Sequence, residues 1–314
     1  MQRRLHIVVT CTKQKGVPVL PRMCLGSINS GDLRKRFSEW CKRLDTDAET
    51  HLVADLYSGD HWVNAQQLPE IASVANVDAS LWVISTGLGL VNNRERVPAY
   101  SATFSTRHFD AVSRETSDFA IWWDMLCARR RQSGSSPASL QELIAAEPCA
   151  SFLVVVSEAY LAAVRTDLEL AAGKLGVGGE LLVISAGTAR SGPLAKFLLP
   201  ADARFQKRLG GIRRSLNIRL AKQLLQECPD GRWRQGGVIE RFGGRLTRLP
   251  PLETPTRTPS SDVDIGRFIL GGLRANPPRS KTVLLRDFRA SGRACEQTRF
   301  GQIFRQTLEI ERAS

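Results

Sequence analysis

Residues 5–16 read Leu-His-Ile-Val-Val-Thr-Cys-Thr-Lys-Gln-Lys-Gly, and this stretch decides the fold. Its apolar, β-branched start predicts a strand over 5–10, and the polar turn that follows carries one thiol and two amines. In α/β proteins, ligands bind beyond the carboxyl ends of the strands. Neighbouring ammonium groups favour the thiolate form of a cysteine, so Cys11 with Lys13 and Lys15 is a candidate for nucleophilic chemistry.

Further strands and helices alternate along the chain. Runs of the same kind predict strands over 51–56, 80–85, 152–157 and 180–185. Between them, apolar residues recur at helical spacing over 31–44 and 158–172. This alternation predicts an α/β fold with a mixed sheet and flanking helices.

The composition excludes several classes of protein. No apolar run in the 314 residues approaches the ~20 needed to cross a membrane, so we expect a cytoplasmic protein without a membrane partner. The seven cysteines form no C-x-x-C pair and there are only four histidines, so we expect no metal site and no cofactor. The chain also lacks a P-loop motif and a G-x-S-x-G nucleophile elbow.

Positive charge is concentrated in the last third of the chain. Residues 1–202 carry 21 Lys and Arg against 21 Asp and Glu, whereas residues 203–314 carry 23 against 10. This segregation predicts a neutral chemical domain joined to parts that bind a polyanion, most simply nucleic acid. The alternative is a generally basic protein whose arginines cover helix surfaces.

We therefore predict four parts. Residues 1–202 form the α/β catalytic and base-binding core, 203–249 a basic helical DNA-binding segment, 250–261 a Pro/Thr/Ser-rich linker, and 262–314 a basic piece resembling a helix-turn-helix. In the basic segment, apolar residues from Leu209 to Leu224 predict one face of a helix, with Gly210-Gly211 at or near its start, where backbone N–H groups could meet a phosphate. The residues expected to contact DNA are Arg204, Lys207, Arg208, Arg213, Arg214, Arg219, Lys222, Lys281, Arg286, Arg289, Arg293 and Arg299.

Three loops of the core are expected to converge on one pocket. They are the Cys11 loop, 55–62, and 85–91 with the nearby Tyr100. The candidate catalytic residues are Cys11, Lys15, Asp55 and His61. The candidate base-binding residues are Thr12, Lys13, Tyr57, Trp62, Ser85, Gly87 and Tyr100. Each has a plainer interpretation, since Cys11 could be a buried apolar residue and His61 a surface histidine.

The order of these motifs resembles the YaaA-like superfamily. The matching stretches are Cys11–Lys15, Asp-Leu-Tyr-Ser-Gly at 55–59, Ser-Thr-Gly-Leu-Gly-Leu-Val at 85–91 and Pro-Ala-Tyr at 98–100. Within the superfamily the chain is most similar to the DpdC type, and it also keeps the Cys-x-x-x-Lys spacing of a related archaeosine synthase domain. It departs from the latter after Lys15, where Gly16-Val17 replaces Pro-Tyr, and in lacking the downstream Ser-x-x-His.

This resemblance implies an activity on DNA. DpdC-type proteins convert 7-cyano-7-deazaguanine in DNA to its 7-amido form, alongside other proteins of a DNA-modification cluster. Such an enzyme would flip the base out of a duplex, after which Cys11 could attack the nitrile or Lys15 could activate it while Asp55 or His61 orients water. The alternatives are a non-catalytic YaaA-like DNA-binding stress protein and a base-excising or nuclease-like enzyme.

Overall fold

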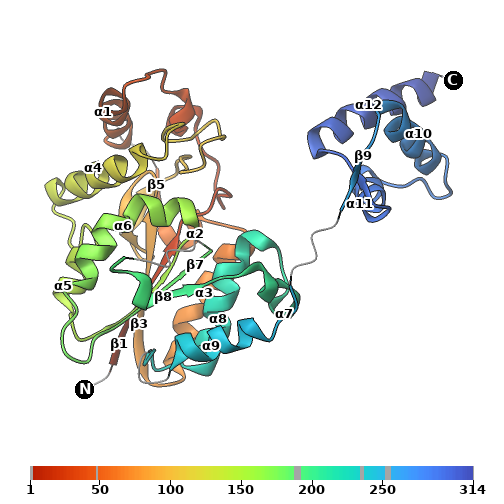
Figure 1. The fold of residues 1–314 in the computed structure, drawn as a ribbon. Helices are drawn as coiled ribbons and strands as arrows, with labels where there is room; N and C mark the ends of the chain where they lie inside the picture. The colour runs from red at the N-terminus through yellow and green to blue at the C-terminus, as the bar shows by residue number, and fades with distance from the viewer. Residues whose placement is uncertain (1–2, 47–48, 187–191, 234–236, 252–255, 314) are drawn as a thin grey trace. The chain divides into compact units, whose positions relative to one another are not determined.

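A computed structural model describes residues 3–46, 49–186, 192–233, 237–251 and 256–313. The chain divides into two compact units, Met1–Pro250 and Pro251–Ser314, which are considered separately. The first unit is α/β with a six-stranded mixed sheet flanked by helices, which confirms the predicted fold class (Figure 1). The described helices are too short or too polar to cross a membrane.

The sheet of the first unit has the strand order β4-β3-β1-β6-β7-β8. All neighbours are parallel except β3 and β4. The strands are β1 (Arg3–Thr10), β3 (Val77–Ser85), β4 (Gly89–Asn92), β6 (Ser151–Val155), β7 (Glu180–Ser185) and β8 (Leu198–Pro200). The central strands read as unbroken apolar runs because helices bury both of their faces.

Helices cover the two faces of this sheet (Figure 1). One face packs against α3 (Asp60–Ser73), α8 (Leu216–Glu227) and α9 (Val238–Thr247). The other side holds α4 (Asp118–Gln132), α5 (Leu140–Ala146) and α6 (Glu158–Ala172), with α1 (Leu33–Leu44) against α4. From β1 the chain passes to β3 on one side and later to β6 on the other, so the strand order reverses at β1. In open α/β sheets, such a reversal marks the crevice in which ligands bind.

The predicted strand over 51–56 is wrong in most of its length. Only β2 (Thr50–Leu52) is extended, and it pairs with β5 (Arg96–Pro98) in a separate two-stranded sheet. The chain then turns into α2 (Val53–Leu56), whose two buried apolar side chains, Val53 and Leu56, lie three residues apart. Side chains three residues apart share one face of a helix, whereas they point to opposite faces of a strand.

The basic segment 203–249 is not a separate part. Its helix α8 packs on α3 and on strands β6 and β7, so it belongs to the first unit's core. The helix predicted from Leu209 is also interrupted: α7 (Gln206–Leu209) ends at Gly210 and Gly211, which both have positive φ, and α8 begins at Leu216. Glycine readily adopts this left-handed conformation, which ends the helix.

The second unit is a small helical body. It contains α10 (Asp262–Leu273), α11 (Lys281–Ala290) and α12 (Gln297–Ala313), and a short parallel ladder joins β9 (Thr258–Pro259) to β10 (Arg293–Ala294). Its core is formed by Ile265, Ile269, Leu284, Phe288, Cys295, Phe300 and Ile303. The last residues of the predicted linker 250–261 therefore belong to this unit, and residues 252–255 lie outside the described part.

Candidate active site

Cys11 lies directly beyond the carboxyl end of β1, where the strand order reverses. Its backbone N–H donates to the carbonyl of Ile84 on β3 at 3.1 Å, which continues the ladder by one residue. The side chain is buried. The thiol is therefore held rigidly at the place where this kind of sheet binds ligands.

Two hydroxyls that sequence reasoning missed lie against this thiol. The Tyr160 hydroxyl, from the first turn of α6, is 3.0 Å from Cys11 Sγ. Thr86 Oγ1 donates to the same Tyr160 oxygen at 2.9 Å. Because Tyr160 accepts from Thr86, its own proton is free to be donated to the sulfur. Burial raises the pKa of Tyr160, so the phenol stays protonated and can stabilise a thiolate.

Lys15 is enclosed by aromatic rings. Its ammonium lies 4.9 Å from the ring centroids of both Tyr57 and Tyr100 and donates to the Thr12 carbonyl at 2.6 Å. Burial lowers the pKa of Lys15, while negative charge at Cys11 and Asp110 opposes that shift. The two rings stabilise the cation through their faces, and the partial loss of water makes the ammonium a stronger acid than an exposed lysine.

The tyrosines of this cage are fixed through their hydroxyls. Tyr57 and Tyr100 lie 3.0 Å apart at their oxygens, and Tyr100 lies 2.6 Å from Ser85 Oγ, which accepts from the Leu88 N–H. Both rings are buried. Their faces are turned to Lys15, so as placed they form the walls of the lysine site rather than a platform for a base.

The turn after β3 is held by two buried tryptophans. Trp122 Nε1 donates to the Thr86 carbonyl and Trp40 Nε1 to the Gly87 carbonyl, both at 2.8 Å. A Cβ on Gly87 would lie only 2.5 Å from the Tyr100 ring. The close packing of Tyr100 is therefore enough to explain why position 87 is a glycine, without a bound ligand.

His61 lies in the first turn of α3, beside the end of β1. Its ring forms a hydrogen bond with the Thr10 backbone, whereas Nε2 is buried and has no partner among the described residues. Burial lowers the pKa of His61 to about 4, so the imidazole is neutral at pH 7 and retains an unused ring nitrogen. Asp55 is exposed on α2, and no hydrogen bond or ion pair in the described chain joins it to Cys11 or Lys15.

The last three of the predicted base-binding residues, Trp62, Thr12 and Lys13, differ in how their side chains are placed. Trp62 is buried against Tyr57, with its Nε1 donating to the Ala54 carbonyl, so its ring has no face open to a base in this structure. Thr12 Oγ1 donates within its own loop to the Gln14 carbonyl. Lys13 is exposed at the loop surface.

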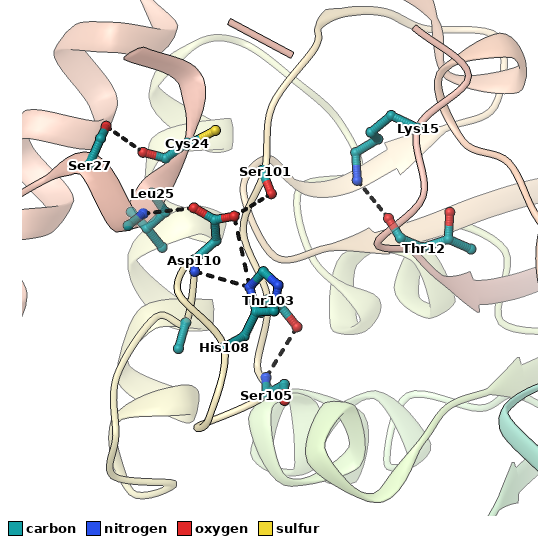
Figure 2. A network of polar contacts seen from close by, with 12 residues as sticks. Thr12, Lys15, Cys24, Leu25, Ser27, Ser101, Thr103, Ser105, His108 and Asp110 are labelled. Atoms are coloured by element: carbon teal, nitrogen blue, oxygen red, sulfur yellow. Dashed lines mark hydrogen bonds and ion pairs between the residues drawn. The ribbon is translucent and has the colours of Figure 1, made fainter. Parts of the chain in front are cut away.

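Asp110 is a further residue that the sequence did not single out. Figure 2 shows its carboxylate facing Ser101 in the same close view as Lys15. It accepts from Ser101 Oγ at 2.7 Å and from the Gly26 N–H at 3.0 Å. Its charge raises the pKa of Lys15 against burial, so this buried carboxylate helps to keep the lysine charged.

The predicted DNA-contact residues of the first unit fall into two groups. Arg219 pairs with Asp60 of α3, Lys222 donates to Gln67, and Arg204 pairs with Asp202, so these three cations hold the fold together. The side chains of the other four are exposed and form neither a hydrogen bond nor an ion pair with any described residue. They are Lys207, Arg208, Arg213 and Arg214, called the free basic patch below.

The second unit contains a basic groove. A cavity of about 470 Å³ is lined by Arg257, Lys281, Arg286 and Arg289 above the apolar Leu285 and Phe300. Arg293 instead stacks over Phe268 and Phe288, and Arg299 pairs with Asp262. Of the five cations predicted here, three therefore line the groove, Arg293 packs on the core rings and Arg299 forms an exposed ion pair.

Comparison with known proteins places the chain in no family. No family model, no curated protein and no solved structure matches it. In the described residues, no group of three or more His, Cys, Asp or Glu side chains is arranged to hold a metal ion. Function is therefore inferred from the geometry around Cys11 and from the motif resemblance.

Proposed function

We propose that this protein hydrates the nitrile of 7-cyano-7-deazaguanine in DNA to the amide, with Cys11 as the nucleophile. The single observation that carries the proposal is the 3.0 Å contact between Cys11 Sγ and the Tyr160 hydroxyl, at the reversal point of the sheet. A thiol supplied with a phenol donor and a neighbouring ammonium suits attack on an electrophilic carbon. The motif resemblance supplies the identity of that carbon.

The reaction has two steps at one carbon. The Cys11 thiolate adds to the nitrile carbon, an electron pair moves to nitrogen, and nitrogen takes up a proton to give a thioimidate. Water then adds across the C=N bond, with its oxygen on carbon and one proton on nitrogen. The C–S bond breaks, sulfur leaves with its electron pair, and the hydroxyl proton returns to Lys15, which gave up a proton in the first step. The product is the amide, the thiolate is regenerated, and the net change is the addition of one water.

Each neighbouring group has a task in these steps. Tyr160 stabilises the thiolate before attack and again when sulfur leaves. Lys15, whose pKa is lowered by burial, polarises the nitrile and supplies the proton to its nitrogen. The unpartnered Nε2 of His61 orients the attacking water. We favour Cys11 over Lys15 as the nucleophile because an amine adduct leads to an amidine rather than to an amide.

The protein would hold the DNA substrate through the phosphates of the DNA backbone. A base inside a duplex must be flipped out of the stack before its nitrile can be attacked, which costs a few kcal/mol. The free basic patch and the groove of the second unit offer cations to phosphates without reading the sequence. We infer that these two surfaces position the duplex while the modified base enters the Cys11 site.

The test is a product measurement on DNA that contains the cyano base. Purified full-length protein should convert it to the amido base, seen as the gain of one water by nucleoside mass spectrometry. Lys15→Ala should slow the conversion without forming another product. If Lys15→Ala abolished a covalent adduct that Cys11→Ala retained, the roles of the two residues would be reversed.

A second candidate function is DNA binding without catalysis. The observation that favours it is the free basic patch, whose four exposed side chains form neither a hydrogen bond nor an ion pair with any described residue. In that case Cys11→Ala would leave every DNA-dependent property unchanged. Affinity would still fall steeply with salt, because the release of counterions from phosphates does not depend on the thiol.

A further inference from the structure

A cavity of the first unit that is not lined by Cys11 has the chemistry of a nucleotide site. Its volume is about 440 Å³, and its lining includes Asn29, Ser30, Arg36, His108, Phe109 and Arg114. These residues come from the turn before α1, from α1 itself, and from the loop that precedes α4. Two arginines and an aromatic ring therefore meet in one hollow.

The two arginines are held in place by backbone carbonyls. Arg36 Nη2 donates to the carbonyls of Leu25 and Ala111 at 3.1 and 3.0 Å, and its buried Nε has no partner in the described chain. Arg114 Nη1 donates to the Thr106 carbonyl at 2.7 Å. Burial and the nearby Arg114 charge both lower the pKa of Arg36. An anion between the two guanidinium groups would relieve their repulsion.

Phe109 gives the same cavity an exposed aromatic face. Its side chain is 67% exposed, so an aromatic ring in the cavity lining is open to solvent. The ring nevertheless rests against the backbone of Gly26, where a Cβ would approach it to 2.4 Å. A ring that stacks on a base needs one face open to solvent and a fixed position. The exposure of Phe109 and its contact with Gly26 meet both requirements.

The cavity is linked to the Cys11 site through Asp110. The carboxylate of Asp110 accepts from Gly26, which lines the cavity, and its charge raises the pKa of both Arg36 and Lys15. Next to it, His108 Nδ1 accepts from the Asp110 N–H, which leaves Nε2 to donate in the neutral imidazole. Figure 2 shows His108, Asp110 and Lys15 in one close view.

We propose that this cavity binds the nucleotide next to the modified base, with its phosphate on Arg36 and Arg114 and its base stacked on Phe109. The inference rests on the proposed function, since it takes DNA as the ligand and Lys15 as part of the reacting site. It adds a defined contact on the flanking strand, which neither the free basic patch nor the groove of the second unit supplies.

Photo-cross-linking of the full-length protein tests this site. The probe is a short DNA carrying the cyano base with 5-iodouracil at each neighbouring position, and the cross-linked peptides are identified by mass spectrometry. Cross-links should map to Phe109 and be lost in Phe109→Leu. The yield should fall about fivefold or more in Arg114→Gln, but it should not change in Arg107→Gln, an exposed neighbour outside the cavity lining.

Two results would overturn the nucleotide site. One is cross-linking confined to other segments, and the other is an equal loss of yield in Arg114→Gln and Arg107→Gln. Nitrile conversion is measured in the same samples. Cross-linking at Phe109 without conversion overturns the proposed catalysis alone, whereas conversion without cross-linking at Phe109 overturns the nucleotide site alone.

Discussion

The Tyr160 hydroxyl lies 3.0 Å from the Cys11 sulfur, although 149 residues separate the two in the chain. Parallel pairing of β1 with β6 brings them together, because α6 begins directly beyond the carboxyl end of β6. Thr86, beyond the end of β3, completes the chain of hydroxyls from the other side. Three neighbouring strands thus each contribute one group to the site.

Removing the Tyr160 hydroxyl should make Cys11 less reactive. A hydrogen bond to a charged group contributes about 1.5–3 kcal/mol, so alkylation of Cys11 by iodoacetamide at neutral pH should slow about tenfold or more in Tyr160→Phe. The exposed Cys149 serves as the control within the same sample, followed by peptide mass spectrometry. An unchanged Cys11 rate would show that the phenol does not stabilise the thiolate.

Acid should destabilise the protein partly through His61. Its pKa is about 4 in the folded state and about 6.5 when unfolded, so below about pH 6.5 the unfolded chain binds the proton more readily. The contribution, at most about 3 kcal/mol, is present above pH 6.5 and is lost as the pH falls towards 4. Between pH 7 and 4.5, the urea-derived free energy of unfolding should fall less in His61→Gln than in the wild type. Equal falls would contradict the assignment.

Gly87→Ala should lower the free energy of unfolding by about 1–3 kcal/mol, because the added methyl group meets the buried Tyr100 ring at 2.5 Å. The matched control is Gly243→Ala on α9, where a Cβ has nothing within 4 Å. A helix gains about 0.5–1 kcal/mol from that change. Thermal and urea unfolding of both variants check the prediction, and equal stability of the two would refute it.

The free basic patch should account for part of any salt-dependent DNA binding. Arg213→Gln/Arg214→Gln should reduce the slope of log affinity against log salt by about 0.9 for each phosphate that the variant no longer neutralises. Arg34→Gln/Lys174→Gln removes two exposed charges elsewhere and should leave the slope unchanged. Arg219→Gln should mainly lower stability, since it breaks the pair with Asp60. Fluorescence anisotropy at several salt concentrations distinguishes these outcomes.

The sequence predicted the central strands because buried parallel strands are continuous apolar runs, as in β1, β6 and β7. It failed at 51–56, where the apolar run suggested a strand although the three-residue spacing of Val53 and Leu56 matches one face of a helical turn. It also included Leu209 and Ile212 in the basic helix, whereas α8 begins only at Leu216, because apolar spacing carries no information about the positive φ of Gly210 and Gly211. The short edge strands β4 and β8 offered too few residues for a periodic signal.

Within the site, the sequence pointed to Cys11 and Lys15 because they follow a strand closely. Tyr160 was missed, although it lies just past a predicted strand and so shared the positional signal that identified Cys11. Asp110 could not be predicted from the sequence, because it lies in an irregular loop and only the tertiary fold brings its charge near Lys15. The number of charged residues in a segment also could not show which cations form ion pairs within the fold. Arg219 pairs with Asp60, whereas Arg213 forms no ion pair with a described residue.

The most direct test of the proposed catalysis is single-turnover nitrile hydration with matched cysteine variants. Stoichiometric wild-type protein and Cys149→Ala should both convert 7-cyano-7-deazaguanine in DNA to the amido base, whereas Cys11→Ala should leave the cyano nucleoside unchanged. Nucleoside mass spectrometry reads the gain of one water in each sample. Unchanged cyano nucleoside with the wild type, or equal conversion by Cys11→Ala, would contradict a catalytic role for Cys11.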